Sequence, residues 1–146
     1  MDADKQHLVR AWIDKAASDL ETAEILIEGT RKRLDTGVYH CHQAAEKMLK
    51  ALLTAGDIPF PKTHNLQELL ILGLPVASDL ATLSDAAIEL TPLATEFRYP
   101  GDEFEPSSED AGEALQKARR IFRAITAEPS IRNVGSPDAS EDNLLK

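Results

Sequence analysis

The sequence has a single cysteine, few aromatic residues and no long apolar run. One cysteine excludes an intrachain disulfide and supplies no pair of thiolate ligands for a metal ion. No apolar stretch approaches the roughly 20 residues that span a bilayer, and the first residues lack the pattern of a signal peptide. We therefore expect a cytoplasmic protein.

The composition favours helices over strands. Aromatic residues make up 5% of the chain and β-branched runs are nearly absent, whereas alanine and leucine are abundant. The net charge of −9 disfavours broad, nonspecific binding of nucleic acid, because such binding depends on neutralising phosphates. This net charge does not exclude a small, local basic site. A chain of 146 residues is expected to form one domain.

Apolar residues recur three or four positions apart in five segments, which is the period of an amphipathic helix. The expected helices cover about residues 7–33, 36–55, 66–72, 79–99 and 108–128. We expect Asp35 or Thr36 to cap the second helix and Ser107 to cap the fifth. Pro92 interrupts the fourth segment, where we expect a kinked but continuous helix; the alternative is a stop and a restart with Thr91 as the cap. Four long helices with short connections predict an all-α, up-and-down four-helix bundle, with the short helix across one end.

The last 18 residues differ from the rest of the chain. Residues 129–146 lose the apolar periodicity and are enriched in Ser, Asp, Asn and Pro. We therefore predict a bundle domain over residues 1–128 and a disordered tail over residues 129–146.

The second expected helix has two different faces. One face is apolar and comprises Val38, Cys41, Ala45, Met48, Leu49 and Leu52. The opposite side carries His40, Gln43 and Lys47, flanked by Glu46 and Lys50. This row offers donors, acceptors and a group that titrates near neutrality, which favours ligand binding. The alternative is a solvated surface with an ordinary Glu46–Lys50 pair, worth about 0.2–0.5 kcal/mol.

Two histidines of this segment have different expected roles. His40 and His42 lie about 200° apart around a helix, so they cannot share one metal ion, and we expect no metal site. His42 falls at the edge of the apolar face and is expected to be a buried, hydrogen-bonded histidine.

Two later segments carry further candidate residues. His64 precedes the third helix, whose cap is Thr63 or Asn65, so it either binds an anion at this helix start or makes a structural hydrogen bond. Arg98 and Tyr99 end the fourth helix. The guanidinium can hold a phosphate and the ring can stack on a base; the alternative is a favourable charge at a helix C-terminus.

The order of these segments resembles the HEPN family, small helical-bundle proteins of prokaryotes. The resemblance covers about residues 5–127 and rests on Trp12, His40 and segments 19–21, 43–47, 49–51, 63–66 and 98–100. It implies a homodimer with a cleft at the subunit interface, and a small nucleotidyltransferase as a frequent partner. Many members are metal-independent ribonucleases and toxins that use an arginine and a histidine separated by four to six residues. Here the corresponding positions hold Glu103, Phe104 and Glu105.

The sequence thus leaves more than one function open. Residues 98–100 (Arg-Tyr-Pro) resemble the nucleotidyltransferase-associated branch, which implies a dimeric partner in a toxin–antitoxin-type module that binds a nucleotide or RNA end without a cofactor. A second hypothesis is a ribonuclease in which His40 or His64 is the general base and Arg98 stabilises the phosphorane. A third is a helical adaptor without a small ligand. The candidate ligand-binding residues are Arg98, Tyr99, His64, Lys47, His40 and Glu46.

Overall fold

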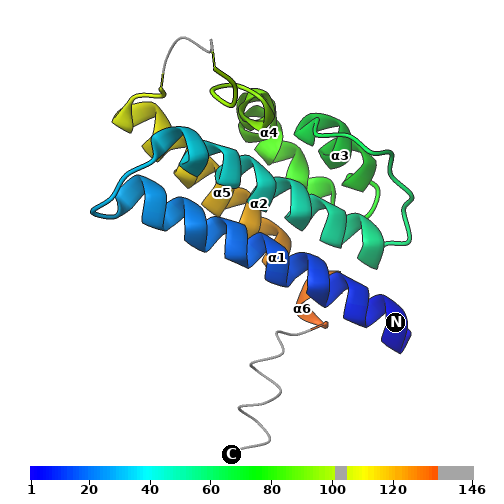
Figure 1. Cartoon of the computed structure of the whole chain (residues 1–146). Coiled ribbons are helices and arrows are strands. Elements are labelled where there is room, and N and C mark those ends of the chain that lie inside the picture. Colours follow the sequence, from blue (N-terminus) through cyan, green and yellow to red (C-terminus); the bar gives the residue numbers. More distant parts are fainter. Residues whose placement is uncertain (101–104, 135–146) are drawn as a thin grey trace, which may run out of the picture.

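The computed structural model describes residues 1–100 and 105–134, and among these it contains helices only (Figure 1). The long helices are α1 (Ala3–Glu28), α2 (Leu34–Ala55) and α5 (Ser108–Thr126). The prediction of an all-α bundle is confirmed. α2 lies at the centre, because α1, α5 and α3 (Leu66–Gly73) all pack against it. Among residues 1–100 and 105–134, no helix combines the length and apolarity that a membrane span requires.

The starts of α1, α3 and α5 follow local capping signals. Asp2 Oδ1 accepts a hydrogen bond from Lys5 N (2.8 Å), which starts α1 at Ala3, earlier than expected. Gly29 ends this helix, also earlier than expected. α2 begins after Arg33, so the expected cap at Asp35 or Thr36 is wrong.

The caps of α3 and α5 agree with the sequence. Asn65 Oδ1 accepts from Glu68 N (3.1 Å), so Asn65 rather than Thr63 caps α3. Ser107 Oγ accepts from Asp110 N (3.0 Å) at the start of α5, as expected.

The fourth bundle element is not one helix. It consists of η1 (Ser78–Leu83), α4 (Ser84–Leu90) and η2 (Thr91–Ala94), of which η1 and η2 are 3-10 helices. The prediction of a kinked, continuous helix is therefore wrong. Pro92 lies in the first turn of η2, where its missing N–H is tolerated, and Thr91 is the first residue of η2 rather than its cap. η2 ends at Ala94, so Arg98 lies beyond the helix end.

The fold also extends past its expected boundary. α6 (Pro129–Arg132) packs against α2 and α5, and Ile131 and Val134 are each only 3% exposed. Val134 O accepts a hydrogen bond from Arg10 Nη2 (3.0 Å). The expectation that the tail begins at Pro129 is therefore wrong, because residues 129–134 cover apolar surface of the bundle. The rest of the expected tail, residues 135–146, lies outside the described residues.

The core sits around α2. The largest buried side chains of α2 are Met48, Leu49, Leu52 and Leu53, and they meet apolar residues of the other helices. α1 and α2 approach closely at Gly37, where a Cβ would lie 2.6 Å from Ile27 Cγ1. This close packing of α1 on α2 positions the polar side chains of α2.

Candidate functional site

A groove of about 210 Å³ lies beside α2, the residues before α3 and the residues after η2. We call it the Arg98 groove. Its lining consists of Tyr39, Gln43, His64, Ala94, Thr95, Arg98 and Tyr99. Three of the residues expected from the sequence, His64, Arg98 and Tyr99, therefore meet in one place although they come from separate segments.

Arg98 is held against an aromatic ring. Its Cζ lies 3.7 Å from the centroid of the Tyr39 ring, a cation–π contact worth about 0.5–1 kcal/mol at an exposed site. Stacking uses the face of the planar guanidinium, whereas the N–H donors point out from its edge. Since Arg98 lies beyond the end of η2, the alternative of a charge that stabilises a helix C-terminus does not apply.

His64 is fixed at both its side chain and its backbone. Its Nδ1 lies 2.6 Å from Glu46 Oε1, while 68% of the His64 side chain is exposed. An ionised carboxylate only accepts, so Nδ1 carries the proton and Nε2 is the acceptor of the neutral ring. His42 Nε2 donates to the His64 carbonyl (2.8 Å). The imidazole is thus oriented, as a carboxylate orients the histidine of a catalytic triad.

Glu46 supports His64 and does not line the groove. Its side chain is 5% exposed, and it also accepts a hydrogen bond from Lys50 Nζ (3.2 Å). Lys50 Nζ in turn lies 5.7 Å from the centroid of the Trp12 ring and 5.8 Å from that of Phe60. The alternative of a solvated Glu46–Lys50 pair is therefore wrong, because neighbouring helices and loops cover both residues.

Lys47 and His40 face α1 and share one partner. Lys47 Nζ lies 2.5 Å from Asp19 Oδ2, and His40 Nδ1 lies 2.8 Å from Asp19 Oδ1. His40 also packs edge-on against Tyr39, with 5.4 Å between ring centroids. Both residues thus lie outside the lining of the Arg98 groove, and His40 is connected to it through Tyr39.

The comparisons with known proteins agree with this architecture. The model of the HEPN domain matches residues 9–128. The chain belongs to the HEPN family. The crystal structure of ST0689, an archaeal HEPN homologue, is similar, with 27% sequence identity and a TM-score of 0.63. The similarity covers 81% of this chain and 94% of ST0689. No curated protein has a matching sequence.

Two buried groups of this HEPN domain have structural roles. His42 is fully buried, as expected, and burial lowers its pKa, so it stays neutral while it donates to the His64 carbonyl. Burial likewise raises the pKa of Cys41 to about 12, which makes a reactive thiolate unfavourable. In the described parts of this HEPN chain, no group of three or more His, Cys, Asp or Glu side chains is placed to hold a metal ion.

Tyr39 and Asp19 were not among the sequence candidates, and Gln43 was named only as part of the polar row of the second helix. Tyr39 and Gln43 line the Arg98 groove, and Asp19 holds Lys47 and His40. Tyr39 and Gln43 are four apart, so both belong to one side of the helix, which is a signal available from the sequence. Asp19 lies on the apolar side of α1 with Ala16 and Ala23, and an acid at such a position signals a buried partner.

Proposed function

We propose that this HEPN protein binds a nucleotide or an RNA end in the Arg98 groove. The stacking of Arg98 on Tyr39, in a groove that His64 also lines, carries this proposal. A guanidinium held by its face presents its edge donors to a phosphate, and it loses less side-chain freedom on binding than a mobile arginine would.

The groove also offers a place for a base. Bases that are not paired stack on aromatic rings and on guanidinium planes. Tyr99 lines the groove and is 68% exposed. A terminal phosphate at Arg98 and a base against Tyr99 describe one nucleotide or one end of a strand.

The net charge of the protein favours binding of an RNA end over binding of a long strand. The chain has a net charge of −9, so the groove is a local basic site on an acidic protein. Contact with one or two phosphates predicts that log K falls with log salt concentration with a slope of about −1, since each phosphate of a single strand contributes roughly −0.7. A protein that tracks along RNA would show a much steeper slope.

Calorimetry with AMP, ATP and short RNAs, phosphorylated at either end, tests the proposal. Wild type should bind at least one of them, and Arg98→Ala should weaken binding by about 2 kcal/mol, roughly 30-fold. Arg31→Ala, an exposed arginine in the α1–α2 loop, is the matched control and should bind as wild type. A folded Arg98→Ala protein with unchanged affinity would place the site elsewhere. Wild type that binds none of the probes would favour an adaptor.

A metal-independent ribonuclease is the second candidate, and the His64–Glu46 hydrogen bond favours it (2.6 Å). Cleavage without a metal needs a general base and a cation at the developing phosphorane charge. His64 and Arg98 supply these groups in one groove, whereas His40 is held by Asp19 behind Tyr39. RNA cleavage in EDTA that His64→Ala abolishes would support this candidate. Intact RNA after incubation with wild type would remove it.

We further propose a homodimer that works with a nucleotidyltransferase-fold partner in a toxin–antitoxin-type module. Resemblance of residues 98–100 to the nucleotidyltransferase-associated branch supports this proposal. Light scattering at micromolar concentration should give twice the chain mass of 16.0 kDa. The mass of a single chain would contradict the dimer.

A further inference from the structure

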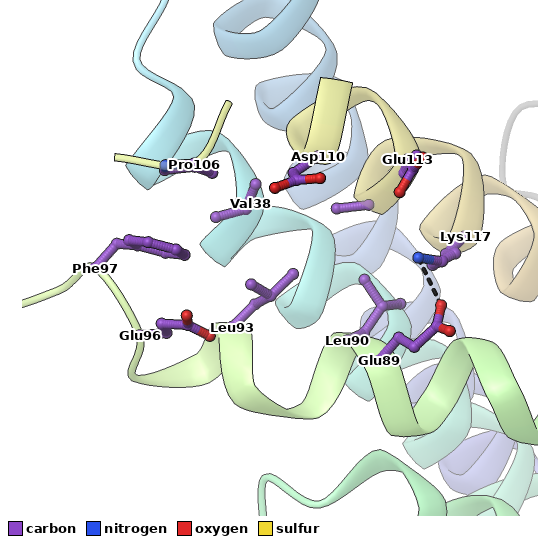
Figure 2. Close-up of a pocket in the computed structure, with 11 residues that line it drawn as sticks. Val38, Glu89, Leu90, Leu93, Glu96, Phe97, Pro106, Asp110, Glu113 and Lys117 are labelled. Atoms are coloured by element: carbon purple, nitrogen blue, oxygen red, sulfur yellow. Dashed lines mark ion pairs between the residues drawn. The ribbon is translucent and has the colours of Figure 1, made fainter. Parts of the chain in front are cut away.

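A second cavity, of about 220 Å³, lies between α2, the α4–η2 segment and α5 (Figure 2). We call it the Phe97 cavity. Its apolar lining consists of Val38, Leu90, Leu93, Phe97, Pro106 and Ala114. Its volume is below the roughly 300–1,000 Å³ that is typical of small-molecule sites. The cavity is thus about the size of a single long side chain.

Acidic residues dominate the polar part of this lining. They are Glu89, Glu96, Asp110 and Glu113, and Lys117 is the basic member. Lys117 Nζ lies 2.6 Å from Glu89 Oε2. Figure 2 marks this ion pair with a dashed line. Within residues 1–100 and 105–134, no lysine, arginine or histidine forms an ion pair with Glu96, Asp110 or Glu113. The rim therefore carries three carboxylates that an incoming cation can neutralise.

Phe97 adds an aromatic ring to the cavity in an unusual way. Its φ is 65°, in the left-handed region that bulky residues rarely adopt. In this conformation its side chain points toward Val38 and Leu93 (Figure 2), while the next residue, Arg98, lines the other groove. Strained backbone of this kind occurs preferentially at binding and switch sites.

We infer that the Phe97 cavity receives an arginine side chain from a protein partner. The aliphatic stem of arginine packs on apolar surface, and its guanidinium stacks on aromatic rings and forms two parallel hydrogen bonds with a carboxylate. The cavity supplies all three kinds of surface in a space of one side chain. Arginines inserted into pockets are also common hot spots of protein interfaces. This inference is independent of the Arg98 groove.

NMR titration of the ¹⁵N-labelled full chain with capped pentapeptides tests the inference. Acetyl-Ala-Ala-Arg-Ala-Ala-amide should cause saturable shifts at the amides of Val38, Leu93 and Ala114. The same peptide with citrulline, which has the same shape without the charge, should bind at least tenfold more weakly. The peptide with lysine should bind about threefold or more weakly, because lysine lacks the planar fork.

Matched variants separate a local site from the overall charge. Glu96→Gln/Glu113→Gln should weaken binding of the arginine peptide about fivefold or more. Asp14→Asn/Glu21→Gln removes the same charge from exposed positions of α1 and should leave the affinity unchanged. The amide spectra of both double variants report directly that they are folded.

Several results would overturn the inference. Equal binding of the citrulline peptide would make the cavity a merely apolar site, and equal binding of the lysine peptide would remove the preference for a guanidinium. Equal weakening by both double variants would show attraction by net charge alone. Shifts that do not saturate, or that centre on other helices, would show that the cavity is not the site.

Discussion

Replacing Glu46 by alanine should lower the free energy of unfolding by about 3 kcal/mol. Glu46 is buried and accepts hydrogen bonds from His64 Nδ1 (2.6 Å) and Lys50 Nζ (3.2 Å). A hydrogen bond to a charged group contributes about 1.5–3 kcal/mol, and removing one partner of a buried ion pair costs about 3–5 kcal/mol. His64 is largely exposed, so its hydrogen bond to Glu46 contributes a free energy at the lower end of the first range. Lys50 is mostly covered and would lose a buried partner.

Urea denaturation monitored by circular dichroism gives this free energy, and thermal melts should show a fall of about 6–12 °C for a chain of this size. Glu46→Gln should cost about half as much, because the amide oxygen still accepts one of the hydrogen bonds. Glu21→Ala, at an exposed position of α1, is the control and should change stability by less than about 0.5 kcal/mol. If Glu46→Ala lowers the free energy of unfolding no more than this control does, Glu46 is a solvated surface residue. The inference that Glu46 orients His64 is then wrong.

Three further predictions concern pH and the C-terminal segment. Burial lowers the pKa of His42 below its usual 6.5, so below pH 6.5 the unfolded chain binds more protons than the folded chain does. Acid should therefore lower the free energy of unfolding by up to about 1.4 kcal/mol per pH unit. Denaturation at several pH values should show a smaller effect of acid in His42→Gln. A chain ending at Glu128 should lose about 3 kcal/mol and melt several degrees lower, because Ile131 and Val134 no longer bury their side chains, whereas one ending at Val134 should melt as wild type. Burial and a hydrogen bond with Asp79 raise the pKa of Glu128. The stability that the protonated form of Glu128 provides is therefore lost as pH rises through that pKa. Urea denaturation should show Glu128→Gln to be more stable than wild type at pH 7–8 but not near pH 4.

The sequence predicted the long helices because their signals are local. The apolar period marked the course of α1, α2 and α5, and Gly56 and Ser107 marked the end of α2 and the start of α5. The 3-10 turns around Pro92 depend on how this segment packs against α2, which its own pattern does not contain. α6 was missed because residues 129–134 are too few to display a period, although two of them are buried.

The site was predictable in its parts but not in its arrangement. His64, Arg98 and Tyr99 line one groove, and these residue types are the ones that recognise phosphates and bases. The roles of Glu46 and Tyr39 were not predictable, because burial of the first and stacking of the second depend on how segments far apart in the sequence meet.

The place at which a nucleotide binds tests the central claim most directly. NMR titration of the ¹⁵N-labelled protein with AMP and with a 5′-phosphorylated dinucleotide locates it without assuming an activity. We expect saturable shifts of the Arg98 Nε–H, the Gln43 side-chain amide and the Thr95 backbone amide. Arg98→Ala should move the midpoint of the Gln43 and Thr95 shifts to a roughly 30-fold higher ligand concentration, and Arg31→Ala should leave all three shifts as in wild type. Saturable shifts centred on another part of the bundle, or none up to millimolar concentrations, would contradict a nucleotide site in the Arg98 groove.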